Sequence, residues 1–420
     1  MHKFKIIPIF LMVALTLALL AGCSSSSEPD SQPPAQAPAQ SPVQSPAQSP
    51  AIQQETSPQD GVAAREPITL NIATAGDANM VDFFQDMIAP AFAEIHPHIT
   101  LNIVGTGPGD DGSRAIHTMW EAQHRVGSRA WNIDVACVHE SVMQQKIEGG
   151  LIEQFVSAIS NSVYVNTPAA KMSLGFNIEG YAVPLFQSQI VLAYNPETVT
   201  NPPRNFDELE SWIAANPNRF GYNGVTGGMS GVGFATAWVY TKSGDYEKIA
   251  LSEYDESVIG SWLDIIRQLR ALPVTYTQGN AGTLDMLNRG EIDMGPVWVD
   301  MLLLWQSDGR MNPNIKMLLP DPGMPGQPMY MVIGSGTAHS EAARDFVNFL
   351  ADPAIQALYV VEKSGWNPGI DPTAVFAQAS DEAIEMLFSD ISAEEFARNG
   401  LAMPVGQFRT DLIRIFEETR

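Results

Sequence analysis

Polar and aromatic side chains follow several short apolar runs of this sequence, at the points where the runs end. ITLNIATAG is followed by Asp77 and Asn79, and GPVWVDM carries Trp298 and Asp300. Carboxylates accept hydrogen bonds from paired hydroxyl groups or bind a cation, and a flat ring covers a sugar or an organic cation. These residue types therefore indicate a site for a small polar molecule, although core packing is an equally open role for Trp298. The other members of this set are Gly107, His139, Glu140 and Ser141.

Further candidates stand in segments that join the larger parts of the chain. Ser188 and Gln189 lie in the long apolar run YAVPLFQSQIVLAYNPETV, and Ser230 lies in the glycine-rich GVTGGMSGVGF. Their hydroxyl, amide and backbone N–H groups are donors for a solute, or they satisfy hinge and loop backbone. Tyr330 and Trp366 add two rings, for which core packing is the competing interpretation.

Catalytic and metal-binding patterns are weak. His117, Glu121 and His124 share one helical face, where a metal site competes with an exposed polar face. GPGDDG matches G-x-G-x-x-G, but Asp110 and Asp111 would repel a pyrophosphate. GGMSGVG lacks the final glycine of G-x-S-x-G, and no pair of carboxylates has a fixed separation for glycoside hydrolysis. We therefore expect no catalytic residue, cofactor or metal ion.

Strand-like and helix-like segments alternate between residues 67 and 140. Strand-like ITLNIATAG, ITLNIVGTG and NIDVACVHE are separated by helical spacing over residues 80–95 and 113–126. This β-α-β-α-β order is typical of an open parallel sheet, in which ligands bind beyond the carboxyl ends of the strands. The candidates that stand at those ends are Asp77, Asn79, Gly107, His139, Glu140 and Ser141.

A second set of strands and helices predicts a second lobe. The run around Ser188 crosses from one lobe to the other, and GQPMYMVIGSG returns, which implies a hinge and a cleft. The predicted division is a first lobe over 67–184 and 329–365, a second lobe over 185–328, and C-terminal helices over 366–420 that pack on the second lobe and the hinge.

The N-terminal region predicts export. Lys3 and Lys5 precede an apolar stretch that is too short to span a membrane comfortably and is typical of a signal peptide over 1–22. LAGC, ending at Cys23, resembles the lipobox of bacterial lipoproteins, whose cysteine carries lipid; a cleaved signal with an unrelated cysteine is the alternative. Residues 23–66 are rich in Pro, Ala, Gln and Ser and predict a disordered tether behind the lipidated cysteine.

Charge and cysteine content narrow the partners. The net charge of -24 excludes a nucleic-acid partner, because phosphates are bound by Lys and Arg. The acidity serves solubility or attracts cationic solutes. Cys137 is the single thiol besides Cys23, so no internal disulfide is expected and Cys137 should be buried.

Three segments in this order resemble bacterial extracellular solute-binding proteins of ABC importers. They are VPLFQSQIVLAYNPETV, LNRGEIDMGPVWVDM and SGTAHSEAARDFVNFLADPAIQ. The resemblance implies a two-lobed α/β fold of the type II periplasmic-binding-protein class, in which each lobe is a mostly parallel sheet flanked by helices and crossing strands form the hinge. It also implies that Trp298 stacks on the solute and that an ABC permease receives it.

The sequence therefore favours a lipid-anchored, monomeric and non-enzymatic receptor on the outer side of the cell membrane, extracellular or periplasmic. A sugar or oligosaccharide is the favoured solute. An organic cation such as a polyamine or a thiamine-like compound is the alternative. A lipid-anchored glycosidase and a sensory partner of a kinase are the rival functions.

Overall fold

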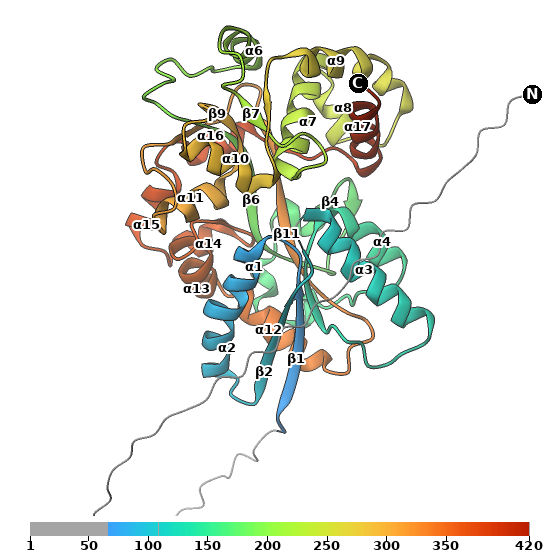
Figure 1. Ribbon diagram of the computed structural model, residues 1–420. Coiled ribbons are helices and arrows are strands. Elements are labelled where there is room, and N and C mark those ends of the chain that lie inside the picture. The colour runs from blue at the N-terminus through green and yellow to red at the C-terminus, as the bar shows by residue number, and fades with distance from the viewer. Residues whose placement is uncertain (1–65, 108, 420) are drawn as a thin grey trace, which may run out of the picture. The chain divides into compact units, whose positions relative to one another are not determined.

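Three parallel strands form the sheet of the first lobe. β1 (Ile68–Thr74) pairs along its length with β2 (Ile99–Gly105) and, near its end, with β3 (Val135–His139). Every residue of β3 is buried, as a strand covered on both faces requires. In Figure 1, α1 and α2 lie on one side of β1 and β2, and α3 lies on the other.

The computed structural model describes residues 66–107 and 109–419, so the predicted signal peptide, Cys23 and almost all of the tether lie outside the described residues. The remaining elements before the first crossing strand are α1 (Ala78–Asp82), η1 (Phe83–Ile88), α2 (Ala89–Ile95), α3 (Gly109–Arg125), η2 (Glu140–Val142), α4 (Met143–Glu148), η3 (Val156–Ala158), η4 (Ser160–Tyr164), α5 (Pro168–Lys171), β4 (Met172–Ser173) and β5 (Phe176–Asn177).

Two long strands cross between the lobes. β6 (Val183–Tyr194) and β11 (Met324–Ile333) pair antiparallel with each other over the first half of β6. The last residues of β11 pair with β3 of the first lobe, and the last residues of β6 pair with β9 (Met294–Trp298) and β10 (Lys316–Leu318) of the second. Each crossing strand therefore belongs to both lobes, and the pair forms the hinge (Figure 1).

The second lobe repeats the arrangement of the first. β7 (Gly221–Tyr222) pairs parallel with β8 (Thr275–Tyr276), and a parallel bridge joins Phe220 to β9. β9 also pairs antiparallel with the crossing strand β6, just as β3 of the first lobe pairs antiparallel with the crossing strand β11. The helices between the crossing strands are α6 (Phe206–Ala215), α7 (Met229–Ser243), α8 (Tyr246–Ala250), η5 (Glu256–Ser261), α9 (Trp262–Ala271), α10 (Gly279–Asn288) and α11 (Val299–Ser307).

The C-terminal segment adds helices around the hinge. Its elements are α12 (Ser340–Leu350), α13 (Pro353–Ile355), η6 (Gln356–Glu362), β12 (Asn367–Pro368), α14 (Pro372–Phe376), α15 (Asp381–Leu387), α16 (Ala393–Asn399), β13 (Gly400–Ala402) and α17 (Gly406–Glu418). α17 packs on α9, where Phe408 lies 5.7 Å from the Trp262 ring and Arg270 lies over Phe416. The two-lobed α/β fold is confirmed, whereas the lobe boundaries at 184, 328 and 365 stay predictions.

Candidate functional site

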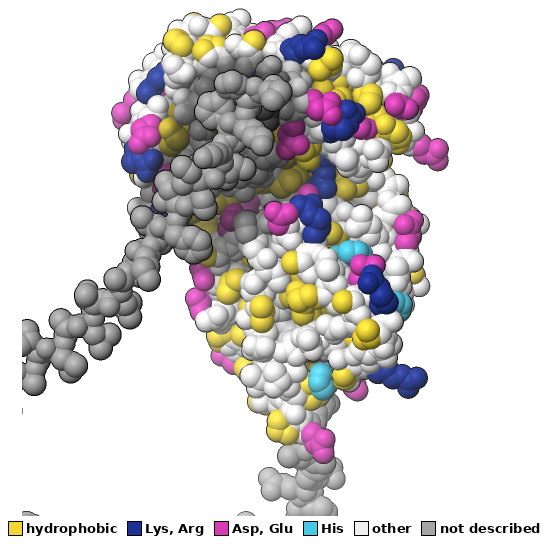
Figure 2. Space-filling view, turned by 45° about the vertical axis from the view of Figure 1, so that its right-hand side comes forward, with side chains coloured by type: hydrophobic (Ala, Val, Ile, Leu, Met, Phe, Trp, Pro, Cys, Tyr) yellow, Lys and Arg dark blue, Asp and Glu magenta, His cyan; other side chains and the backbone are white. Residues whose placement is uncertain are grey.

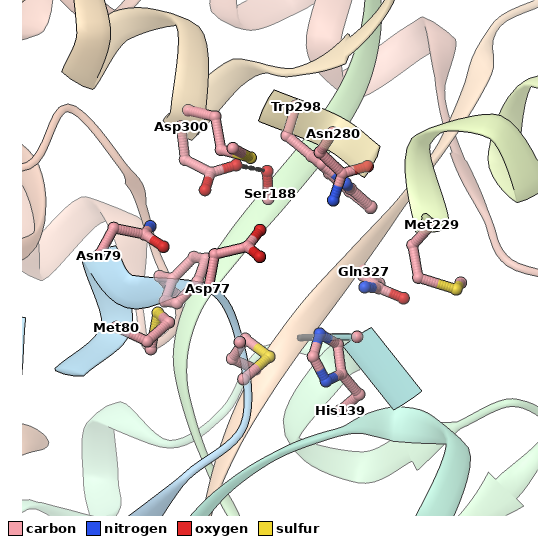
Figure 3. A pocket seen from close by; sticks show the side chains of 15 residues that line it. Asp77, Asn79, Met80, His139, Ser188, Met229, Asn280, Trp298, Asp300 and Gln327 are labelled. Carbon is pink, nitrogen blue, oxygen red and sulfur yellow. Dashed lines mark hydrogen bonds between the residues drawn. The ribbon is translucent and has the colours of Figure 1, made fainter. Parts of the chain in front are cut away.

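A cavity of about 60 Å³ lies where strand ends of the two lobes meet the crossing strands (Figure 3). Its polar side chains come from α1, β3, α10, α11 and both crossing strands, and its apolar ones include four methionines. The polar lining residues are Asp77, Asn79, His139, Ser188, Asn280, Asp300 and Gln327. The other lining residues are Gly76, Met80, Gly109, Phe186, Met229, Trp298, Met301 and Met329.

Asp77 faces Asn280 across the cleft. Asp77 is the residue before α1, and its carboxylate caps no backbone N–H of that helix, so it is available to the cavity. The Oδ1 atom of Asn280 accepts hydrogen bonds from Asn223 Nδ2 and Ser230 Oγ, both at 2.9 Å. The remaining donor of this amide, Nδ2, belongs to the second lobe and is near enough to Asp77 of the first lobe to lower its pKa. Burial nevertheless raises the pKa of Asp77, more than the amide of Asn280 lowers it.

Two glycines allow these close approaches. Gly76 has φ of +122°, and a Cβ there would lie 2.5 Å from Met80 Cγ. A Cβ at Gly228 would lie 2.5 Å from Asn223 Nδ2 and 2.6 Å from Asn280 Oδ1. The glycine-rich segment before α7 is therefore needed to bring Asn223 and Asn280 together.

Asp300 is the most buried carboxylate of the cavity lining. It lies in the first turn of α11, where backbone N–H groups favour a negative charge, and its Oδ1 accepts a hydrogen bond from Ser188 (Figure 3). Burial raises its pKa to about 6, and the nearby charge of Asp77 adds to this rise. Asp300 is therefore mostly ionised at neutral pH and is held without a basic partner.

His139 closes the side of the cavity that belongs to the first lobe. It is the last residue of β3, and its Nδ1 lies 3.1 Å from Ser113 Oγ. Burial lowers its pKa, although Asp110 acts in the opposite direction. The ring is therefore neutral at neutral pH and provides a hydrogen-bonding group rather than a charge.

The cavity brings together about half of the residues predicted as ligand contacts, and solute contact stays a prediction for all of them. Asp77, Asn79, His139, Ser188, Trp298 and Asp300 line it. Trp298 is buried and also lines the cavity, so core packing and solute contact are both compatible with its position.

The other predicted contacts lie behind or beside the cavity. Ser230 holds Asn280, and Gln189 donates to the backbone carbonyl of Met324 at 2.5 Å. Trp366 is buried 4.3 Å from the ring of Phe186, which itself lines the cavity. Gly107 receives a hydrogen bond from the backbone of Gly76 through its carbonyl.

A second cavity lies on the opposite face of the crossing strands, and we name it the rear cavity. Alternate residues of the strands point to the two faces: Ser188 and Gln327 line the first cavity, and Gln187 and Pro328 line the rear cavity. Glu140 and Tyr330 line the rear cavity too. Burial raises the pKa of Glu140 to about 8, and its Oε1 has no hydrogen-bond partner in the described structure.

A buried ion pair also joins the lobes. Arg409 Nη2 of α17 lies 2.9 Å from Asp110 Oδ2 of α3, and both side chains are almost covered. Ser141 donates to the other oxygen of Asp110 at 2.6 Å. Burial alone would raise the pKa of Asp110, but Arg409, His139 and Ser141 together hold it below its ordinary value. Ser141 therefore supports a contact between the lobes.

Asn280, Gln327 and the methionines were missed by sequence reasoning. Asn280 lies after β8, where the rule that ligands bind beyond the carboxyl ends of parallel strands would have found it. β8 has only two residues, however, and so short a strand gives little periodic signal in the sequence. Gln327 pairs with Ser188 across the hinge, and that register follows only from the tertiary structure. The methionines are indistinguishable from core residues in the sequence.

No group of three or more His, Cys, Asp or Glu side chains that could hold a metal occurs in the described part of the chain. Within residues 66–107 and 109–419, no helix is long and apolar enough to cross a membrane. Cys137 is buried, as expected, and burial raises the pKa of its thiol.

Comparisons with known proteins agree with this arrangement. The sequence profile of the bacterial extracellular solute-binding protein family matches residues 77–357. Maltose-bound MalE3 of T. maritima shares 16% identity over 84% of this chain and 95% of its own, with a TM-score of 0.66. The spermidine/putrescine substrate-binding protein PotD of Streptococcus pneumoniae shares 14% over 84% and 99%, with a TM-score of 0.58. A periplasmic thiamin binding protein shares 16% over 85% and 97%, with a TM-score of 0.56. No curated protein matched the chain.

Two lobes, a hinge of crossing strands and a cavity between the lobes define the class of two-lobed solute receptors. The chain belongs to the bacterial extracellular solute-binding protein family. The family's description as extracellular solute-binding proteins implies an extracellular or periplasmic location.

Proposed function

We propose that this protein is a lipid-anchored receptor that captures one small solute in the cleft and hands it, unaltered, to an ABC permease. The observation that carries this proposal is that both lobes and the crossing strands line one cavity, with Asp77 of the first lobe and Asn280 of the second among its lining residues. A solute that touches both lobes stabilises the closed arrangement, and a permease distinguishes closed from open receptors by their surfaces.

Attachment to the membrane through Cys23 is part of this proposal. The lipobox-like LAGC and the proline-rich segment after it support the anchor. The tether would keep the folded part near a permease while leaving it free to rotate.

The sugar expected from the sequence and its organic-cation alternative both suit a cavity with carboxylates and an indole ring. Hydrolysis of a glycoside finds no support in the cavity, because one of its two carboxylates, Asp300, is held by a hydrogen bond from Ser188. We therefore treat the site as a binding site.

A thermal-shift screen of the full-length protein in detergent tests the receptor function. Ligand at 100 times its Kd adds about 2.7 kcal/mol to the free energy of unfolding, so a true ligand raises Tm clearly. Small-angle scattering should show a smaller radius of gyration with the ligand, and chromatography should recover the ligand unchanged. Conversion of the ligand to a product, or a Tm increase without any closure, would contradict the proposal.

A further inference from the structure

We propose that the solute of this cavity is an organic cation, with its positive nitrogen held by Asp77 and Asp300 and its alkyl or aromatic body against the methionines and Trp298. This inference rests on the proposed function and names the solute class. It replaces the sugar that the sequence favoured.

The first step is the charge of the cavity. Two carboxylates line it, and no Lys or Arg does. Neither Asp77 nor Asp300 takes part in an ion pair within the described residues, whereas Asp110 nearby is paired with Arg409. The site therefore carries uncompensated negative charge at neutral pH.

The second step is the cost of closing this site over a neutral molecule. Removing an unpaired carboxylate from water is expensive, and two carboxylates that sense each other's charge add repulsion. A sugar supplies hydroxyl donors but no charge, so both anions would stay uncompensated in the closed cleft. An amine or ammonium group between them removes both penalties.

The third step is the hydrogen bonding that the cavity leaves open. Gln327 Oε1 is buried and has no partner in the described structure, so it offers an acceptor. The hydroxyl of Ser188 is already used by Asp300, and the oxygen of Asn280 already accepts from Asn223 and Ser230. A ligand rich in donors, as protonated amines are, fits this inventory.

The fourth step separates an organic cation from an inorganic one. The thioethers of Met80, Met229, Met301 and Met329 and the rings of Phe186 and Trp298 form the rest of the wall. Calcium and magnesium ions require shells of oxygen ligands and gain nothing from such groups. Methylene or methyl groups pack on thioethers, and a cation is attracted to the face of an indole ring.

The test uses the full-length protein in detergent with two ligand panels at equal ionic strength. The cation panel contains putrescine, spermidine, choline, tetramethylammonium and thiamine, and the neutral panel contains glucose, maltose and a longer oligosaccharide; calcium and magnesium chloride form a third set. We expect at least one organic cation, and no sugar, to raise Tm and to bind in calorimetry.

Asp300→Asn removes the negative charge but keeps the shape of the side chain. The amide oxygen can still accept the hydrogen bond from Ser188. We expect the affinity for the cation to fall about 30-fold or more, as for loss of one partner of a buried charge pair. Asp308→Asn, in an exposed pair with Arg310 at the end of α11, is the control and should bind normally. Asp77→Asn gives a second variant if Asp300→Asn melts early without ligand.

The pH dependence adds an independent readout. Choline does not titrate, so its affinity should fall as the pH drops through about 6, where Asp300 gains a proton. Asp77 and His139 face the same cavity and titrate as well, so the Asp300→Asn variant must lose most of this dependence for the inference to hold.

The outcomes separate the two proposals. A sugar that binds equally to wild type and Asp300→Asn overturns the cation inference and leaves the receptor function intact. Binding of calcium or magnesium alone overturns the organic character of the ligand. If no compound of any set binds, the cation inference fails, and if a wider metabolite library also gives no ligand, the receptor function fails with it.

Discussion

At the scale of single residues, this protein buries charges in two different ways. Asp300 is buried beside a cavity that a ligand can enter, whereas Lys146 of α4 is buried inside the first lobe with no hydrogen-bond partner in the described structure. The ammonium of Lys146 lies 4.5 Å from the centre of the Trp120 ring, and burial lowers its pKa to about 7. Asp300 is thus buried at a candidate site, whereas the burial of Lys146 lowers the stability of the fold.

Lys146→Met should therefore stabilise the protein. The folded-state pKa of about 7 lies below the ordinary 10.5, so the unfolded chain binds more protons between these values and wild-type stability rises with pH across that window. We expect the variant to gain roughly 1–3 kcal/mol in the free energy of unfolding at neutral pH, after loss of the cation–π contact, and to lack this rise. Urea unfolding at several pH values measures both effects. The exposed Lys363, changed to Met, is the control; an equal gain there would contradict the explanation.

Trp298 allows a second prediction at this scale. Its indole forms part of the cavity wall at the end of β9, so Trp298→Ala removes a stacking surface while the strand stays paired. We expect the ligand-induced rise in Tm to disappear. Trp305→Ala in the same helix as Asp300, but outside the cavity lining, should keep it. A normal ligand response in Trp298→Ala would show that the solute sits elsewhere.

Residues at strand ends were accessible to sequence reasoning, and residues that depend on register were not. Asp77, His139 and Asp300 were predicted because parallel strands deliver their carboxyl ends to one edge. Glu140 follows the same strand as His139 but lies on the opposite side, in the wall of the rear cavity. A shift of one residue along the chain moves a side chain to the other face of the sheet. The sequence alone does not tell which of two neighbouring residues points to which face.

At the scale of secondary-structure elements, α17 has a role that its position near the chain end does not suggest. It packs on α9 of the second lobe and sends Arg409 to Asp110 of the first. This ion pair joins the two lobes in the described residues, so we expect it to favour the closed arrangement. The order of elements predicted the two lobes, but such a contact depends on side chains that are distant in sequence.

Arg409→Gln should shift the unliganded protein toward the open state. In the variant, Asp110 would be buried without a basic partner when the lobes are closed, and it would return to water when they open. The unpaired charge therefore destabilises the closed state. We expect a larger radius of gyration without ligand and an affinity about 10-fold lower, because the binding-competent fraction falls. Arg414→Gln in the same helix, where Arg414 pairs only with Asp411 and Glu418 of α17, is the matched control. Equal scattering curves for the two variants would contradict a latch.

At the scale of the whole molecule, one face shows how charged side chains are distributed on the surface. On the face in Figure 2, acidic and basic side chains are scattered among uncharged ones. This distribution suits solubility, while the negative charge that we propose for ligand binding lies inside the cavity.

The proposed anchor gives a prediction at this scale. Cys23→Ser removes the sulfur that would carry lipid, so the protein should move from the membrane fraction to the medium or periplasm, as followed by immunoblotting of fractionated cells. Its ligand affinity should not change, because the residues that line the cavity all lie between Gly76 and Met329. Retention of the variant in the membrane would show that another feature holds the protein there.

The rear cavity has a consequence for how this receptor can evolve. The two cavities lie on opposite faces of the same crossing strands. A rotation about these strands that narrows the first cavity would therefore widen the rear cavity. Bulkier side chains at Gln187 or Pro328 would obstruct one end of that motion without meeting the solute. Selection can therefore adjust how readily the receptor releases its cargo independently of which cargo it chooses.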